Sequence, residues 1–204
     1  MSRTTHNPEL TRRALLDSAA GHIHRLGFQA ASLDAILTES GVSKGALYHH
    51  FATKQELGLA VVDEIYGQPF LAELAIQLNR SADPLTDLAL VLRSKREGAT
   101  LCSVQHGCPL NNLAQELAGQ DEAFRQRINA IMQAWRNLLQ DALDRAAQAG
   151  LLRSGVDTAR EALFLVASLE GATGLAKTTR DPAVYTHCLE VLEEHLLGLR
   201  VRAS

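Results

Sequence analysis

The residues best suited to chemistry lie in one short segment near the N-terminus. Lys44 is a donor that matches the O6 and N7 acceptors of guanine in the major groove. Gly45 and Ala46 are small, so the backbone beside them can approach base edges, and Ala46 can contact a thymine methyl group. Tyr48 and His50 can donate hydrogen bonds to phosphates. These residue types together indicate contact with double-stranded DNA.

Two short helices joined by a tight turn are expected to position these side chains. Ser32 and Ser43 are suitable N-caps for the two helices, and their N-termini also suit phosphate. Gly41 ends the first helix, because glycine tolerates the positive φ that the turn requires. Thr53 and Glu56 have the spacing of a capping box that opens the next helix. The pattern predicts a helix-turn-helix.

The second of these helices is expected to have a buried side and an open side. Val42, Leu47 and Phe51 are expected to pack inward. The residues expected to face outward, fully or in part, are Lys44, Gly45, Ala46, Tyr48, His49 and His50. From composition and spacing alone, a plain packing unit of two capped helices is an alternative to DNA binding.

The segment resembles the DNA-binding domain of the TetR family of repressors over roughly residues 9–58. The resemblance is carried by Gly27-Phe28, Ser32-Leu33, Ile36, the run Gly41-Val42-Ser43-Lys44-Gly45-Ala46-Leu47-Tyr48-His49-His50-Phe51, and Lys54-Gln55-Glu56-Leu57. It implies that Lys44, Gly45 and Ala46 face bases. It implies that Tyr48, His49, His50 and Lys54 mainly face the DNA backbone. The family also implies a two-fold dimer that reads a palindromic operator, with recognition helices roughly 34 Å apart.

The whole chain is predicted to be all-α, with about nine helices that form a three-helix head and a larger body. Alanine and leucine are frequent, aromatic residues make up only 4%, and there are only 5 prolines, which favours long uninterrupted helices. The expected domains are residues 1–58 for DNA binding and 59–204 for ligand binding and dimerisation.

Composition favours a soluble, cytoplasmic protein. The net charge is −3, but Lys and Arg exceed Asp and Glu by one within residues 1–58, which weakly favours nucleic acid there. The 3 cysteines, an odd number, form no CxxC motif, and the polar N-terminus does not resemble a signal peptide. The apolar stretch at 162–169 is far shorter than the roughly 20 residues of a membrane span. No catalytic, metal-binding or cofactor-binding pattern is recognised, so no enzyme activity, metal or cofactor is expected.

The last two helices are expected to form the dimer interface. Residues 162–169 are apolar on nearly all sides, so they need cover from both their own domain and a partner. The segment from Ser168 onward is similar to the end of many family members, in which these helices form a four-helix bundle across the two-fold. The expected interface residues are Leu165, Ser168, Gly171, Ala172, Val184, Cys188, Val191, Leu192 and His195. Helices interior to a monomer are the alternative.

A pocket for an unknown small-molecule inducer is expected among the middle helices, by analogy with the family. Residues that could line it are Tyr66, Phe70, Cys108, Trp135, Phe164 and Glu170. Each of them also fits an ordinary core position. Glu170 needs a partner, because it is an acid within an apolar helix, and that partner could also lie across the dimer.

Cys108 precedes Pro109 and is therefore expected at the N-cap of a helix, where a thiolate is stabilised. The entry to this helix is also similar to a family subgroup that includes electrophile sensors. A repressor switched by oxidation or alkylation of Cys108, with Cys102 as resolving partner, is therefore an alternative to reversible induction. An inert, half-buried cysteine is the simpler interpretation.

A helical protein–protein adaptor that never touches DNA is the alternative from another functional class. Salt dependence separates the two, because binding to phosphates weakens steeply as salt rises and an apolar groove does not behave in this way. The sequence therefore predicts a DNA-binding repressor, released by a ligand, as its first interpretation.

Overall fold

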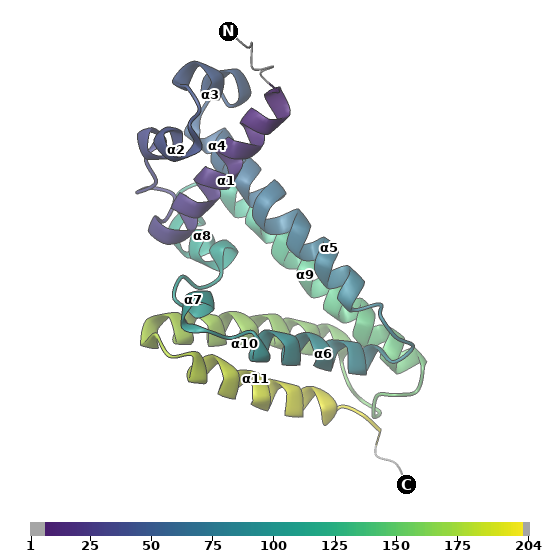
Figure 1. Cartoon of the computed structure of the whole chain (residues 1–204). Helices are drawn as coiled ribbons and strands as arrows, with labels where there is room; N and C mark the ends of the chain where they lie inside the picture. The colour runs from purple at the N-terminus through teal and green to yellow at the C-terminus, as the bar shows by residue number, and fades with distance from the viewer. Residues whose placement is uncertain (1–6, 202–204) are drawn as a thin grey trace. The chain divides into compact units, whose positions relative to one another are not determined.

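The computed structural model describes residues 7–201, and the elements within them are helices, with one isolated bridge between Leu152 and Arg200. The polar N-terminal residues 1–6 lie outside this range. The prediction of an all-α fold is confirmed (Figure 1). In chain order the elements are α1 (Pro8–Leu26), α2 (Leu33–Ser40), α3 (Lys44–His50), α4 (Lys54–Val61), η1 (Val62–Gly67), α5 (Gln68–Gln77), α6 (Pro84–Glu97), α7 (Leu101–Val104), α8 (Pro109–Leu117), α9 (Glu122–Gln148), α10 (Thr158–Thr179) and α11 (Pro182–Leu197).

Side-chain caps explain where most of these helices begin. The Ser32 hydroxyl accepts from the N–H of Ala35 at 3.1 Å, and the Ser43 hydroxyl accepts from the N–H of Ala46 at 3.2 Å. Aspartates at 83, 157 and 181 cap α6, α10 and α11 in the same way. The capping box predicted at the start of α4 differs from the standard arrangement in one hydrogen bond. The Thr53 hydroxyl caps Glu56 at 3.0 Å, but the Glu56 carboxylate accepts from Ala52, one residue earlier, at 2.8 Å.

The fourth helix continues further than its first turn indicates. The elements α4, η1 and α5 follow one another without a break from Lys54 to Gln77. The middle segment Val62–Gly67 is a π-helix, an insertion that shifts the side chains after it around the helix axis. Val61, Val62 and Gly67 are buried in this stretch, so the widened turn is packed against its neighbours.

The helices gather into two compact units that do not follow chain order. The first unit contains residues 7–69 and Pro109–Ile128. The second contains Phe70–Cys108 and residues 129–201. Helix α9 contributes to both, because its residues up to Ile128 pack in the first unit and the rest pack in the second. No local signal in the sequence indicates that α8 belongs with the N-terminal helices.

The core of the first unit forms where α1, α2, α3 and α4 meet. Leu15, Ile36 and Leu47 are at most 2% exposed, and Phe51 is 5% exposed. The buried hydroxyl of Ser18 donates to the carbonyl of Ile36 at 3.0 Å, which ties α1 to α2 and satisfies a polar group inside the core. This packing fixes α2 and α3 against α1.

Helix α8 and the start of α9 hold the loop that follows α1. Phe28 packs against Phe124 of α9 with ring centroids 4.7 Å apart. The Glu116 carboxylate of α8 accepts from the N–H groups of Phe28 and Gln29 at 2.9 and 2.7 Å. These contacts satisfy backbone donors of the loop after α1, so the loop leading into α2 is anchored by residues far along the chain.

In the second unit α11 packs against both α6 and α10 (Figure 1). Glu193 of α11 is buried and pairs with two arginines of α6, Arg93 and Arg96, the latter at 3.2 Å. After α11 the backbone of Arg153 donates to Leu199, and that of Val201 donates to Leu151, both at 2.9 Å. No helix in the described part of the chain is long and apolar enough to cross a membrane.

Candidate nucleic-acid interface

Helix α3 is anchored by apolar side chains and leaves its polar side chains open. Leu47 and the following Phe51 are buried, at 2% and 5% exposure. Lys44 and His49 are exposed, and Tyr48 is 48% exposed. Ala46 and His50 are half-buried, as is Val42, which was expected to pack inward. The exposed surface of α3 therefore presents an ammonium, a phenol and an imidazole on one short, rigid element.

Two glycines shape the approach to this surface. Gly41 has φ 66°, so the turn between α2 and α3 uses the left-handed conformation that glycine adopts without strain. A side chain at Gly45 would meet nothing within 4 Å in this structure. The first turn of α3 is thus open on that side, and another molecule can approach its backbone closely.

The remaining polar residues of the predicted set divide into two groups. Ser32 and Ser43 are exposed, and each accepts a backbone N–H while its own O–H remains a donor. Lys54 is engaged within the unit instead. Its ammonium donates to the carbonyl of Gln29 at 3.2 Å and lies 4.7 Å from the centre of the Phe28 ring. Burial lowers the pKa of Lys54, partly offset by the charge of Glu116.

An ion pair beside the interface fixes α1 against the π-helical segment. The Arg12 guanidinium donates to both carboxylate oxygens of Glu64, each at 2.6 Å. The hydrogen bonds from Arg12 hold the pKa of Glu64 below its usual value. Arg12 also lies 5.2 Å from the centre of the Phe51 ring, the residue that ends α3. Arg12 of α1 therefore contacts both the π-helical segment, through Glu64, and Phe51, the residue that follows α3.

Most of the predicted dimer-interface residues lie together on α10 and α11. An open groove of about 580 Å³ runs along these helices. The residues expected at the interface that line it are Ser168, Gly171, Ala172, Cys188, Val191, Leu192 and His195. Its surface is apolar and solvent-exposed, with Val191 at 66% and Leu175 at 56% exposure.

Three residues of the second unit lie away from their predicted place. Leu165 is 2% exposed and faces the interior of its own unit rather than the groove. Val184 is half-buried on the first turn of α11 and does not line the groove. Phe164, expected in a ligand pocket, lines the groove at 48% exposure and packs edge-to-face with His195.

The other predicted pocket residues do not form one cluster. Tyr66 is in the first unit, and its hydroxyl donates to the carbonyl of Ala20 at 2.6 Å. Burial raises the pKa of Tyr66. Phe70 and Trp135 meet edge-to-face in the second unit, with centroids 5.1 Å apart.

Glu170 and Cys108 are near a residue that the sequence did not single out, Tyr185. Burial and the charge of Glu170 raise the pKa of Tyr185 to about 12, and Cys108 contributes in the same direction. None of the three cysteines forms a disulfide; Cys102 is exposed, and Cys108 is half-buried directly before α8. Within residues 7–201 no group of three or more His, Cys, Asp or Glu side chains is arranged to hold a metal.

Sequence reasoning missed two kinds of residue. Glu116 anchors the loop before α2 from a position 88 residues away, and no local pattern could indicate this. Leu175 and His187 line the groove on α10 and α11. Leu175 was detectable in principle, because it follows Ser168, Gly171 and Ala172 on the same helix at spacings close to the helical repeat.

Comparisons with known proteins agree with this arrangement. Residues 15–61 match the model for bacterial regulatory proteins of the tetR family, and residues 84–192 match a tetracyclin repressor-like C-terminal domain. The transcriptional regulator AcuR of Cereibacter sphaeroides is 29% identical over 182 residues, covering 88% of this chain and 82% of that protein. An HTH-type regulator of Lactococcus lactis is 28% identical, covering 92% of this chain and 94% of its own.

Solved structures extend the likeness to the whole fold. A regulatory protein TetR from Rhodobacter sphaeroides superposes with a TM-score of 0.80 at 28% identity, covering 94% of this chain and 100% of that one. A TetR regulator from Chloroflexus aurantiacus gives 0.83 at 26% identity, covering 96% and 98%.

Together with these matches, the exposed helix-turn-helix, whose turn uses Gly41, identifies the chain as a DNA-binding transcriptional regulator. With a matching C-terminal model over more than half of its length, the chain belongs to the TetR family.

Proposed function

We propose that this protein is an inducible repressor that acts in the cytoplasm and binds a palindromic operator as a homodimer. In this proposal residues 1–58 bind DNA, and residues 59–204 bind a small molecule and dimerise. The observation that carries the DNA-binding role is α3, in which Lys44, Gly45 and Tyr48 are exposed while Leu47 anchors the helix.

The first turn of α3 is proposed to enter the major groove. Lys44 would donate to guanine O6 and N7, and the absence of a side chain at Gly45 lets the helix approach the base edges. Ala46 would contact a thymine methyl group. Tyr48, His49 and His50, together with the hydroxyls of Ser32 and Ser43, would contact phosphates and set the register. Lys54 would act mainly by holding the loop at Gln29, since its ammonium is already bound there.

The apolar groove on α10 and α11 supports the dimer. Val191, Leu175 and Phe164 line this groove and are between 48% and 66% exposed. Clustered exposed apolar side chains of this kind mark interaction surfaces. A second copy related by a two-fold axis would cover the same residues on both chains, as an isologous interface requires. Two α3 helices would then read half-sites about one DNA turn apart.

For a ligand to relieve repression, the dimer must have a DNA-bound form and a second form that does not bind DNA. A ligand can shift the dimer away from its DNA-bound form only if it binds the other form more tightly. Selection of bound sequences from random DNA with purified protein yields the operator, and a compound screen for release from that operator identifies inducers.

The direct test compares operator binding by variants of exposed α3 residues. Lys44→Ala is expected to lower operator affinity about ten- to one-hundredfold and to relax specificity at one base pair of each half-site. Tyr48→Phe is expected to weaken binding similarly to all sequences, and it should leave the salt dependence unchanged because the phenol carries no charge. Arg125→Gln, on α9 of the same unit, removes one exposed cation and serves as the control. Unchanged binding by both α3 variants would overturn the DNA-binding assignment.

The same assay separates the alternative in which Cys108 is the switch. If reversible inducers act, Cys108→Ser responds to them as the wild type does. If release occurs only with hydrogen peroxide or N-ethylmaleimide and Cys108→Ser abolishes it, the ligand-released repressor is wrong and the thiol switch replaces it. Binding that is insensitive to salt would instead favour a protein–protein adaptor.

A further inference from the structure

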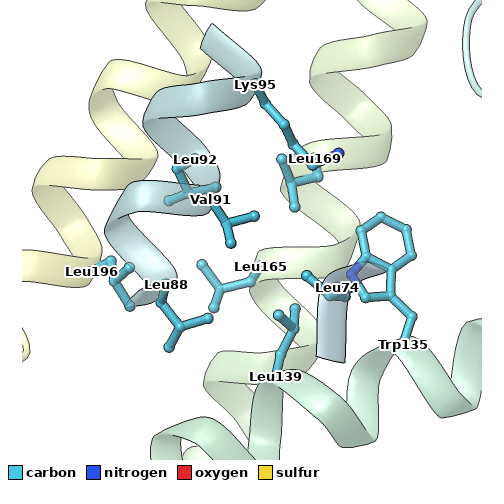
Figure 2. Close-up of a pocket in the computed structure, with 10 residues that line it drawn as sticks. All are labelled: Leu74, Leu88, Val91, Leu92, Lys95, Trp135, Leu139, Leu165, Leu169 and Leu196. Carbon is cyan, nitrogen blue, oxygen red and sulfur yellow. The ribbon is translucent and has the colours of Figure 1, made fainter. Parts of the chain in front are cut away.

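The second unit encloses an apolar cavity of about 20 Å³ between α5, α6, α9, α10 and α11 (Figure 2). Seven leucines and Val91 form most of its wall, and Trp135 and Lys95 complete it. Trp135 is only 5% exposed. Space for about one water-sized group, lined by aliphatic carbon, stays dry and favours an apolar occupant.

Lys95 is the unusual member of this wall. Its side chain is half-buried, and its ammonium lies 5.7 Å from the centre of the Phe70 ring. Within residues 7–201 no carboxylate lies within 4.0 Å of this ammonium. The neighbouring cations of α6, Arg93 and Arg96, both pair with Glu193. Lys95 therefore forms no ion pair among the described residues.

A larger cavity of about 130 Å³ adjoins the first and shares Leu74, Val91 and Lys95 with it. Phe70, Ser94, Glu73 and Gln77 complete its lining. The Glu73 carboxylate accepts from the Gln77 amide at 2.9 Å, so the lining acid is engaged with its own helix. The volume is close to the roughly 150 Å³ of an engineered cavity that holds benzene.

We propose that the two cavities form one binding site for a small apolar carboxylate. The carboxylate pairs with the Lys95 ammonium and accepts from the Ser94 hydroxyl. The hydrocarbon part, about six carbons by the benzene comparison, lies against Phe70, Leu74 and Val91. A longer tail can enter the leucine-lined cavity beside Trp135. The site deepens the proposed function by naming an inducer class, and its role as an inducer rests on that proposal.

Other ligand classes fit the site less well. A neutral hydrocarbon would bury the Lys95 ammonium further without compensating its charge, which costs free energy. A cation would be repelled by the Lys95 ammonium, which lines both cavities, whereas the Glu73 carboxylate lines only the larger one. A large, rigid ligand exceeds the available volume. A carboxylate removes the unpaired charge and fills the apolar space in a single step.

Trp135 provides the readout, because it is the single tryptophan of the chain and its indole lies in the cavity wall. The purified full-length protein is titrated with benzoate and with hexanoate, without DNA, and tryptophan emission and heat are recorded. Benzamide and hexanol are the neutral matched probes. Both carboxylates are expected to change the emission saturably and to bind more tightly than the neutral probes. If no carboxylate binds, or if the neutral probes bind equally well, the proposal is wrong.

Variants separate the charge from the packing. Lys95→Met is expected to weaken carboxylate binding about ten- to one-hundredfold, whereas Lys95→Arg retains it within a few-fold. Arg153→Met removes an exposed cation elsewhere in the same unit and is expected to leave binding unchanged. Equal affinity of Lys95→Met and wild type, with circular dichroism unchanged, would overturn the site.

Operator release is then measured separately. Lys95-dependent binding without release would leave the site standing and contradict only the proposed induction.

Discussion

Glu64 and Arg12 form a bidentate pair whose side chains are 35% and 31% exposed. The hydrogen bonds from Arg12 lower the pKa of Glu64 from its ordinary 4.5, so the pair stabilises the fold above that pH and the contribution is lost as pH falls through the lowered value. Because the pair is partly exposed, Glu64→Gln is expected to lower the free energy of unfolding by about 0.5–1 kcal/mol at neutral pH.

Urea denaturation followed by circular dichroism measures this loss. The difference between Glu64→Gln and wild type should disappear well below pH 4.5. Asp141→Asn changes an exposed carboxylate on α9 that has no ion pair within the described residues, and it serves as the control. A difference that persists at acid pH would mean that Glu64 stabilises the fold through packing rather than charge.

Two lysines near the interface separate binding from stability. Lys44 is exposed, whereas the Lys54 ammonium donates to Gln29 and lies over the Phe28 ring. Lys54→Ala is therefore expected to lower the free energy of unfolding by about 1 kcal/mol, and Lys44→Ala to leave it unchanged. Operator affinity should fall more for Lys44→Ala. Thermal denaturation and fluorescence anisotropy with labelled DNA test the pair, and a reversed order would contradict the assigned roles.

These residues also show what sequence could predict about the site. Lys44 and Tyr48 were predicted to face outward because the apolar side chains of the segment, Leu47 and Phe51 among them, need burial and leave the polar ones open. The engagement of Lys54 was not predicted, because its partner Gln29 lies 25 residues away and is brought close only by the packing of α4 on the loop after α1. The spacing of residues along the sequence predicts which side of one helix is buried. It does not predict contacts between helices, because these depend on the fold.

At the scale of elements, Gly58 permits the close packing of three segments. A methyl group at Gly58 of α4 would lie 2.5 Å from the Phe28 ring and 2.8 Å from the Phe124 ring. Phe124 is fully buried, so its ring has little room to move. Gly58→Ala is therefore expected to destabilise the protein by about 1–3 kcal/mol through overpacking.

Urea midpoints compare this variant with Gly45→Ala. A side chain at Gly45 meets nothing within 4 Å, so Gly45→Ala should keep or slightly raise stability through helix propensity. If Gly58→Ala were as stable as wild type, the α4, Phe28 and Phe124 contact would be looser than the structure indicates.

Helix starts were predictable because their signals are local. Ser32, Ser43 and Thr53 each cap the helix that follows, as expected. The π-helical segment at Val62–Gly67 and the membership of α8 in the first unit were not predictable. A π-turn has no sequence signature of its own, and the contact of Glu116 with the loop after α1 depends on chain folding over 87 residues or more.

At the scale of the whole molecule, the all-α class could be predicted from composition and from the repeated N-cap signals. The dimer interface could not be predicted in full, because it depends on which apolar side chains remain exposed after the helices have packed. Sequence placed Leu165 on that surface together with Val191. In the structure Leu165 is 2% exposed and Val191 is 66% exposed. Both residues are apolar and helical, and only the packing of α10 against the rest of its unit separates them.

Val191 therefore provides the sharpest test of the proposed homodimer. A glutamate at this position would place a charge in the apolar groove of α10 and α11, where a dimer would desolvate it twice, once from each copy. Val191→Glu is expected to yield a folded monomer by light scattering. Its operator affinity should fall by at least about one-hundredfold, because each half-site then binds without the second.

Ile76→Glu, at a position 71% exposed on α5 and outside the groove, should leave both mass and affinity unchanged. A Val191→Glu protein that kept wild-type mass would exclude this groove as the interface, since a buried, unpaired pair of carboxylates could not be tolerated there.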